Sequence, residues 1–156
     1  MSLFGCKPSN DKLSTSINDQ HIILFSSLPL EYARLKKVTH GLCHFESLKS
    51  IGNDNFVLTG WAIPSEVETQ ASSTIIVSIK SSSQESFGLL RRISRQDVAD
   101  HFKNPKLIAS GFEANFRKED LPLNSCMNVY QILRGQMIEC PNSLYVDLKQ
   151  MKSCSP

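Results

Sequence analysis

The chain has 156 residues, of which 40% are hydrophobic and 21% charged, a composition that fits one ordinary globular domain and excludes fibrous and disordered proteins. Seventeen basic and fifteen acidic residues are interspersed and leave a net charge of +2, which excludes the basic surface of a nucleic-acid-binding domain. No run approaches the roughly 20 apolar residues of a membrane-spanning helix.

The first forty residues differ in pattern from the rest. Residues 1–20 are rich in Ser, Asn, Asp and Lys with little periodicity, which is typical of a linker. Residues 21–40 predict a short amphipathic segment, with Ser27 as the N-cap and Pro29 as the first residue of a helix that continues to Lys37. We expect the folded domain over residues 41–150 and a C-terminal tail over residues 151–156.

From residue 41 onward, strand-sized apolar runs are separated by polar turns. Three runs alternate between apolar and polar side chains and so bury one face, as in Phe112, Ala114 and Phe116. The run 127–133 is apolar in both registers, which leaves its inward face open. We predict an all-β sandwich, immunoglobulin-like or jelly-roll-like, with about seven strands, one inserted helix and a helical or extended N-terminal segment. The predicted strands are 42–48, 56–63, 74–80, 87–93, 112–116, 127–133 and 144–148.

The inserted helix is predicted over residues 95–103. Ser94 is the expected N-cap, and Asp97 three residues later completes a capping box. Val98 and Phe102, four residues apart, form the expected buried stripe. These four side chains are therefore assigned structural roles.

Four further residues are given structural roles. Pro105 ends the helix and opens one more turn, which Gly111 is expected to close in the left-handed conformation before Phe112 starts a strand. Trp61, the only Trp, is expected to fill the core between the two sheets, although a lone Trp is also a stacking platform for a sugar ring.

The five cysteines show no CxxC pair and no zinc-ligand spacing with His, so no metal site is expected. Their pairing is left open, because five cysteines allow fifteen two-disulfide patterns. Cys43 and Cys126 each lie in an apolar run, where we expect small buried thiols. The surroundings of His40 and His44 predict the entry of a strand, where a spacing of four does not bring two rings together.

Catalytic motifs are missing from the sequence. It contains no G-x-S-x-G nucleophile elbow and no glycine-rich phosphate loop, so we expect no enzyme activity and no cofactor. Asp97, Asp100 and His101 contain the groups for proton transfer, but a helix cap and a solvated helix face account for them. Arg91, Arg92 and Arg95 are candidates to bind an anionic ligand through two parallel hydrogen bonds each. The alternative is that these arginines face water or pair with Asp97 and Asp100.

A set of short motifs resembles one bacterial family. The motifs are Gly60-Trp61-Ala62, the stretch RQDVADHFKNP over 95–105, Ser110-Gly111-Phe112, Leu121-Pro122 and Tyr130. They are similar to small β-sandwich accessory domains appended to polysaccharide-related glycosyltransferases and to polytopic cell-envelope membrane proteins. The resemblance covers residues 55–133. It departs from the family at Pro64-Ser65, where an Asp is usual, and over 123–128, which lacks the usual Gly.

The resemblance implies a binding or spacer module without known catalytic residues, and it does not identify a ligand. Separately from the resemblance, Arg92, Arg95 and Tyr130 are the candidate ligand-binding residues. The leading hypothesis is a non-catalytic, extracytoplasmic binding or spacer domain of a bacterial envelope protein. Its expected partners are a glycan or a neighbouring domain, with membrane contact only through a tether outside the fold. One alternative is an exported lipoprotein acylated on Cys6. A second is a small hydrolase that uses Asp97 and His101.

Overall fold

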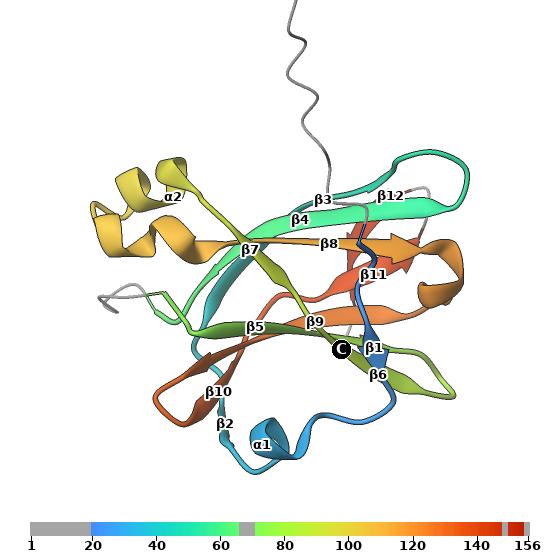
Figure 1. The fold of residues 1–156 in the computed structure, drawn as a ribbon, viewed down its shortest axis with the longest axis horizontal. Helices are drawn as coiled ribbons and strands as arrows, with labels where there is room; N and C mark the ends of the chain where they lie inside the picture. Colours follow the sequence, from blue (N-terminus) through green and yellow to red (C-terminus); the bar gives the residue numbers. More distant parts are fainter. Residues whose placement is uncertain (1–19, 66–70, 148–149, 155–156) are drawn as a thin grey trace, which may run out of the picture.

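The protein folds as an all-β sandwich, in agreement with the predicted class. The computed structural model describes residues 20–65, 71–147 and 150–154. Within these ranges the strands form a four-stranded and an eight-stranded sheet, packed face to face (Figure 1). The four-stranded sheet runs in the order β3 (Leu42–Ser50), β4 (Asn55–Ile63), β8 (Gly111–Arg117) and β7 (Arg91–Ile93).

The eight-stranded sheet contains a six-strand path and a C-terminal hairpin. The path is β1 (Leu24–Phe25), β6 (Glu85–Leu89), β5 (Thr74–Lys80), β9 (Cys126–Leu133), β10 (Gln136–Glu139) and β2 (Lys36–Val38). The hairpin is β11 (Leu144–Asp147), which pairs with β9, and β12 (Gln150–Ser153). The helices are short: α1 (Leu30–Ala33), α2 (Gln96–His101) and the 3-10 helices η1 (Pro105–Ser110) and η2 (Lys118–Asp120).

The core lies between the two sheets, where the alternation of the strands places it. On β8 the buried side chains are Phe112, Ala114 and Phe116, as predicted. On β9 the inward residues Met127 and Val129 join the same cluster. The predicted strand 87–93 is divided into two strands, β6 and β7. The chain passes from the eight-stranded to the four-stranded sheet at Leu90, which is buried.

The N-terminal segment is part of the sandwich, which corrects the predicted boundary at residue 41. β1 pairs with β6 at one edge of the eight-stranded sheet, and β2 pairs in parallel with β10 at the other. The predicted helix from Pro29 to Lys37 is a single turn, since Pro29 rather than Ser27 is the N-cap and Lys36 already lies in a strand. Extended pairing with β10 replaces the remaining helical turns.

Residues 26–35 cross the outer face of the eight-stranded sheet from β1 to β2. Three of their side chains pack on outward-facing residues of β5, β9 and β10 and form a second apolar cluster. The crossing contributes Leu28, Tyr32 and Leu35, and the sheet contributes Ile76, Tyr130, Ile132 and Met137. Both faces of β9 are therefore buried, which is why its sequence is apolar in both registers.

Two cysteine pairs lie at disulfide distance, which corrects the prediction of buried free thiols. Cys43 and Cys140 join β3 to the end of β10, with a Cα–Cα distance of 5.6 Å. Cys126 and Cys154 join β9 to the chain after β12, with a Cα–Cα distance of 6.2 Å. The predicted tail from residue 151 thus belongs to the fold through β12 and this bridge. Cys6 lies outside the described residues.

Candidate functional site

Trp61 lies on the outer face of the four-stranded sheet, and not between the sheets as predicted. On β4 the inward positions are Leu58, Gly60 and Ala62, so that Trp61 faces outward. The ring of Phe112 occupies the space above Gly60, where an added Cβ would lie 2.5 Å from its Cζ atom. The Trp61 ring is half-buried and packs edge to face on Phe102, at 5.9 Å between centroids.

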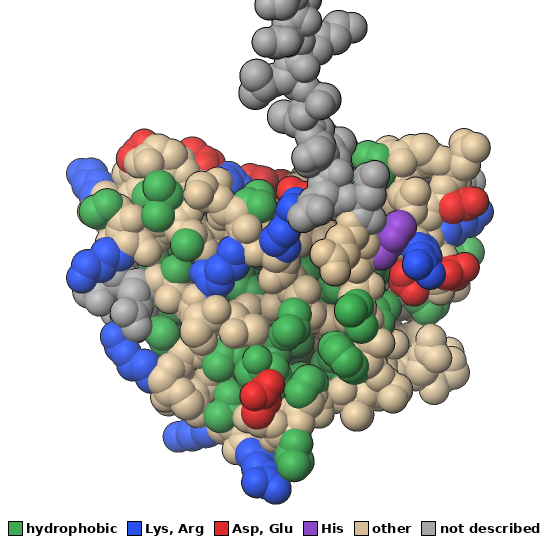
Figure 2. Space-filling model, in the orientation of Figure 1, with side chains coloured by type: hydrophobic (Ala, Val, Ile, Leu, Met, Phe, Trp, Pro, Cys, Tyr) green, Lys and Arg blue, Asp and Glu red, His purple; other side chains and the backbone are tan. Residues whose placement is uncertain are grey.

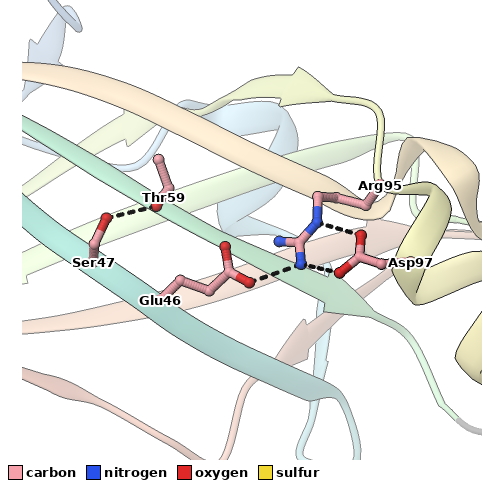
Figure 3. A network of polar contacts seen from close by, with 5 residues as sticks. All are labelled: Glu46, Ser47, Thr59, Arg95 and Asp97. Carbon is pink, nitrogen blue, oxygen red and sulfur yellow. Dashed lines mark hydrogen bonds and ion pairs between the residues drawn. The ribbon is translucent and has the colours of Figure 1, made fainter.

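Arg95, the N-cap residue of α2, connects α2 to β3 on this same outer face, as Figure 3 shows. Its Nη2 atom contacts Oε1 of Glu46 on β3 at 2.7 Å and Oδ2 of Asp97 on α2 at 2.5 Å, and its Nε atom donates to Oδ1 of Asp97 at 2.8 Å. The Arg95 side chain is only 15% exposed. Beside this network, the hydroxyls of Ser47 and Thr59 hydrogen-bond across β3 and β4 at 2.8 Å.

Gly111 allows Arg95 to lie close to the sheet. An added Cβ on Gly111 would lie 2.5 Å from Cγ of Arg95 and 2.7 Å from the carbonyl oxygen of Ile93. The φ of Gly111 is −71°, so the predicted left-handed conformation is wrong and the glycine is required for close packing instead. Gly111 pairs with Trp61 across the β4–β8 ladder, so the Arg95 stem packs on the strand position beside Trp61.

We call Glu46, Ser47, Thr59, Trp61, Arg95 and Asp97 the Trp61 face. The hydrogen bond from Arg95 lowers the pKa of the Asp97 carboxyl to about 2, and the two carboxylates raise the pKa of the Arg95 guanidinium. The Nη1 atom of Arg95 is buried without a hydrogen-bond partner. The face therefore combines an aromatic ring with fixed carboxylates, a guanidinium and two hydroxyls.

The predicted capping box at α2 does not form. The N-cap is Arg95 rather than Ser94, and no side chain caps the helix. Asp97 instead pairs with Arg95, because a charged partner two residues away competes with the helix amides for its oxygens. The predicted apolar stripe is confirmed, since Val98 and Phe102 lie in one cluster with Ile63, Leu107, Leu42 and Trp61.

The residues of the hydrolase hypothesis have separate partners. Asp97 pairs with Arg95, Asp100 accepts a hydrogen bond from Gln96 at 2.8 Å, and the His101 ring packs on Phe102 at 4.9 Å between centroids. A proton-transfer site requires its acid and base to meet at one reacting atom. This arrangement does not bring them together.

The three predicted ligand-binding residues lie in three different places. Arg92 on β7 donates to the Ala109 carbonyl at 2.5 Å and to the Ser72 hydroxyl at 2.9 Å, and burial lowers its pKa. Tyr130 is buried under the residue 26–35 crossing, where burial raises the pKa of its hydroxyl. Arg95 alone belongs to the Trp61 face, which adds residues that the sequence did not single out for binding: Glu46, Ser47 and Thr59.

A separate apolar cleft of about 270 Å³ opens beside β1. Its lining comes from the segment before and in β1, the last residue of β6, the first residue of β7, and β8. The lining residues include Ile23, Phe25, Leu89, Arg91, Glu113 and Ala114. The sequence did not predict this cleft, because a two-residue strand leaves too short a periodicity to recognise.

Comparisons with protein-family models, with curated proteins and with solved structures returned no match for this chain. The resemblance to bacterial accessory domains therefore remains a prediction from its motifs. Over residues 20–65, 71–147 and 150–154, no cluster of His, Cys, Asp and Glu is arranged to hold a metal ion. No helix in this part of the chain is both long and apolar enough to cross a membrane.

Proposed function

We propose that this chain is a non-catalytic binding domain that works outside the cytoplasm of a bacterium, as part of an envelope protein, and contacts glycan through the Trp61 face. The observation that carries the proposal is the placement of Trp61 on an outer sheet face beside fixed polar groups. The resemblance of residues 55–133 to envelope accessory domains supports the same conclusion.

The cysteine pairs support the extracytoplasmic location. Disulfides form and persist in oxidising compartments and are rare in the reducing cytosol. Here both pairs bridge strands that are far apart in the sequence, by 97 and 28 residues. Each pair would hold the sandwich together in a compartment without reductant.

The chemistry of the Trp61 face fits a sugar. A pyranose ring presents C–H groups that pack on an aromatic ring, and hydroxyls that pair with carboxylates and guanidinium groups. Trp61 supplies the ring, while Glu46 and Asp97 supply acceptors that Arg95 already holds in place. Because these acceptors are ordered before binding, little side-chain entropy is lost when the ligand arrives.

Retardation in native gels that contain a soluble polysaccharide tests the proposal. The polysaccharides are a β-1,4-glucan and a soluble chitin derivative, each compared with a gel that contains no polymer. We expect retardation by at least one polymer, and its loss in Trp61→Ala and Glu46→Gln. Trp61→Phe should keep part of the retardation, because a smaller aromatic ring still packs on a sugar.

Glu119→Gln is the matched control for Glu46→Gln. Glu119 pairs with Arg117 at 3.5 Å on an exposed part of β8 and η2, outside the Trp61 face. Its replacement should leave retardation unchanged. Equal mobility with and without every polymer, or retardation that survives Trp61→Ala, would contradict the proposal.

A further inference from the structure

The apolar cleft beside β1, which we call the β1 cleft, gathers large apolar side chains that the fold leaves exposed. Ile23, Phe25 and Leu89 line the cleft and are 65%, 44% and 48% exposed. Three of the seven exposed large hydrophobic side chains among the described residues therefore lie in one cleft. In Figure 2, hydrophobic side chains gather where Figure 1 places β1 and β6. Single apolar residues are ordinary on a surface, but a contiguous group of them marks a binding site.

The chain that forms one side of the β1 cleft is attached to both sheets. The Ile22 amide donates to the Asn115 carbonyl of β8 at 2.8 Å, which attaches the chain before β1 to the four-stranded sheet. Two residues later, Leu24 pairs with Gly88 and attaches β1 to the eight-stranded sheet. Gly88 allows this close approach, because an added Cβ would lie 2.5 Å from Cδ1 of Ile22. The cleft is thus formed before a ligand arrives, as in most small-molecule sites.

The charged groups of the β1 cleft neutralise each other. Of the described residues that line it, Arg91 and Glu113 carry charge, and the Nη2 atom of Arg91 contacts Oε1 of Glu113 at 2.5 Å. The Nε2 atom of His21, which also lines the cleft, shares a hydrogen bond with Oδ1 of Asn55 at 2.7 Å. With His21 neutral, the cleft has no net charge to attract an ion. A ligand of complementary chemistry has an apolar part and an uncharged polar part.

The β1 cleft borders the Trp61 face directly. Glu113 of the cleft pairs with Thr59 of the Trp61 face in the β4–β8 ladder, and Thr59 hydrogen-bonds to Ser47 on β3 at 2.8 Å. On its other side, Glu113 pairs with Arg91 on β7. Side chains of directly paired residues point to the same face of a sheet, with Cβ atoms about 5 Å apart. A polar row therefore crosses all four strands and ends at the apolar side chains of the β1 cleft.

We propose that the β1 cleft holds the apolar aglycone of a neutral glycoside whose sugar lies on the Trp61 face. The inference rests on the proposed function, because the sugar of this ligand occupies the glycan site proposed above. The polar row would pair with sugar hydroxyls, and Ile23, Phe25 and Leu89 would contact the apolar chain. A cleft of about 270 Å³ has the volume of about nine water molecules at about 30 Å³ each, and a methylene group is close to water in size. The cleft therefore fits an alkyl chain of about eight to ten carbons.

Isothermal titration calorimetry of the full chain with alkyl glycosides tests this inference. The probes are cellobiose and chitobiose, the disaccharide units of the two polymers above, each free and as its hexyl, octyl, decyl or dodecyl glycoside below micelle-forming concentrations. Octanol is the probe without a sugar. Burial of one methylene group changes affinity about fourfold, so the octyl glycoside of at least one disaccharide should bind up to about 15-fold more tightly than its hexyl glycoside. From decyl to dodecyl the gain should be less than about twofold, because the cleft is then full.

Matched variants separate the β1 cleft from general affinity for alkyl chains. Ile23→Ser should remove most of the gain from hexyl to octyl, and Leu89→Ser should reduce it. Leu123→Ser is the control, because Leu123 is 64% exposed and does not line the cleft. This control should leave every affinity unchanged. Trp61→Ala should weaken binding of the octyl glycoside, since the sugar and the chain belong to one ligand.

Several outcomes would overturn the inference. They are equal affinities for the hexyl and octyl glycosides, a gain that Ile23→Ser retains, octanol binding as tight as that of the octyl glycoside, and octyl glycoside binding that Trp61→Ala leaves unchanged. Self-association in analytical ultracentrifugation that Ile23→Ser abolishes would overturn it as well, and would assign the cleft to a second copy of the chain.

Failure of this inference is distinguishable from failure of the proposed function. If affinity does not depend on chain length while polysaccharide still retards the protein, the inference about the cleft fails and the proposed function stands. If no polymer retards the protein, the proposed function fails and the inference fails with it.

Discussion

Arg95 is the residue on which the outer face of the four-stranded sheet depends. It joins β3 to α2 through two carboxylates while its stem lies over Gly111. A guanidinium in this position stabilises through packing of its stem as well as through its charge. Removing it leaves two neighbouring carboxylates without their shared cation.

We expect Arg95→Ala to lower the free energy of unfolding by about 1–2 kcal/mol, since it removes packing and charged hydrogen bonds together. Urea denaturation measures the change. Arg117→Ala is the control, because Arg117 is 58% exposed and its carboxylate partner lies at 3.5 Å. The control should cost less than about 0.5 kcal/mol. Equal losses in the two variants would contradict a special role for Arg95.

The Asp97–Arg95 pair makes stability depend on pH in the acid range. The pKa of Asp97 is about 2 in the folded protein, against about 3.9 in an unfolded chain. The stabilisation is therefore present above about pH 4 and is lost as the pH falls toward 2. Thermal unfolding of the wild type and of Asp97→Asn should differ at pH 6 and converge near pH 2. A difference that stays constant from pH 6 to pH 2 would exclude this linkage.

Trp61 shows what sequence alone could not decide at the scale of one residue. In residues 56–63 one register buries Phe56, Leu58 and Ala62, and the other buries Val57 and Trp61. The size of Trp favoured the second. The structure adopts the first, because Phe112 on a neighbouring strand fills the space above Gly60. Gly60 and Phe112 are 52 residues apart, so the alternation of apolar and polar residues within one strand does not predict their contact.

We expect Trp61→Ala to cost about 1–3 kcal/mol, less than the 3–5 kcal/mol of a fully buried aromatic residue. The half-buried ring still packs on Phe102 and seals the apolar cluster beneath α2. Chemical denaturation monitored by circular dichroism measures the change without relying on Trp fluorescence. A loss above about 4 kcal/mol would instead place Trp61 among the core residues.

Among the elements, the two disulfides should differ in what they contribute. Closing the 97-residue loop between Cys43 and Cys140 should contribute about 4.7 kcal/mol, and closing the 28-residue loop about 3.6 kcal/mol. The double Ala variant of the first pair should therefore be less stable by about 1 kcal/mol than that of the second. Urea denaturation of the two variants compares them directly, and the reverse order would count against the loop-length argument.

The sequence predicted the long strands and missed the short ones. The predicted strand 74–80 matches β5, and 42–48, 56–63, 112–116, 127–133 and 144–148 overlap β3, β4, β8, β9 and β11. β1, β2 and β10 have two to four residues, too few for a period of two to be recognised. The predicted N-terminal helix is too long, because the pairing of β2 with β10 overrides the helix propensity at the end of LEYARLKK.

At the scale of the whole molecule, residues 20–40 decide whether the sandwich is complete. We expect a chain that starts at Asp19 to unfold at the same urea concentration as the full chain. A chain that starts at Gly41 should lose at least about 3 kcal/mol, since it uncovers several apolar side chains worth about 1.5–3 kcal/mol each. Equal stability of the two truncated chains would show that the crossing over the sheet is dispensable.

The fold class followed from composition and alternation, whereas the binding surfaces did not. The Trp61 face joins Glu46, Thr59 and Arg95, which come from three separate elements and meet only through the order β3-β4-β8-β7. Strand order is a property of long-range pairing, and local sequence patterns do not contain it.

The parallel pairing of β2 with β10 also bears on how the chain folds. Lys36 pairs with Gln136, 100 residues later, and Cys43 bonds to Cys140 across nearly the same span. During synthesis, which starts at the N-terminus, β2 must therefore stay unpaired until β10, near the end of the domain, has been made. Contacts of such high sequence separation slow folding, because a long loop must close before they stabilise anything. Once β2 has paired with β10, oxidation of Cys43 and Cys140 would lock this late-forming pairing with a covalent bond.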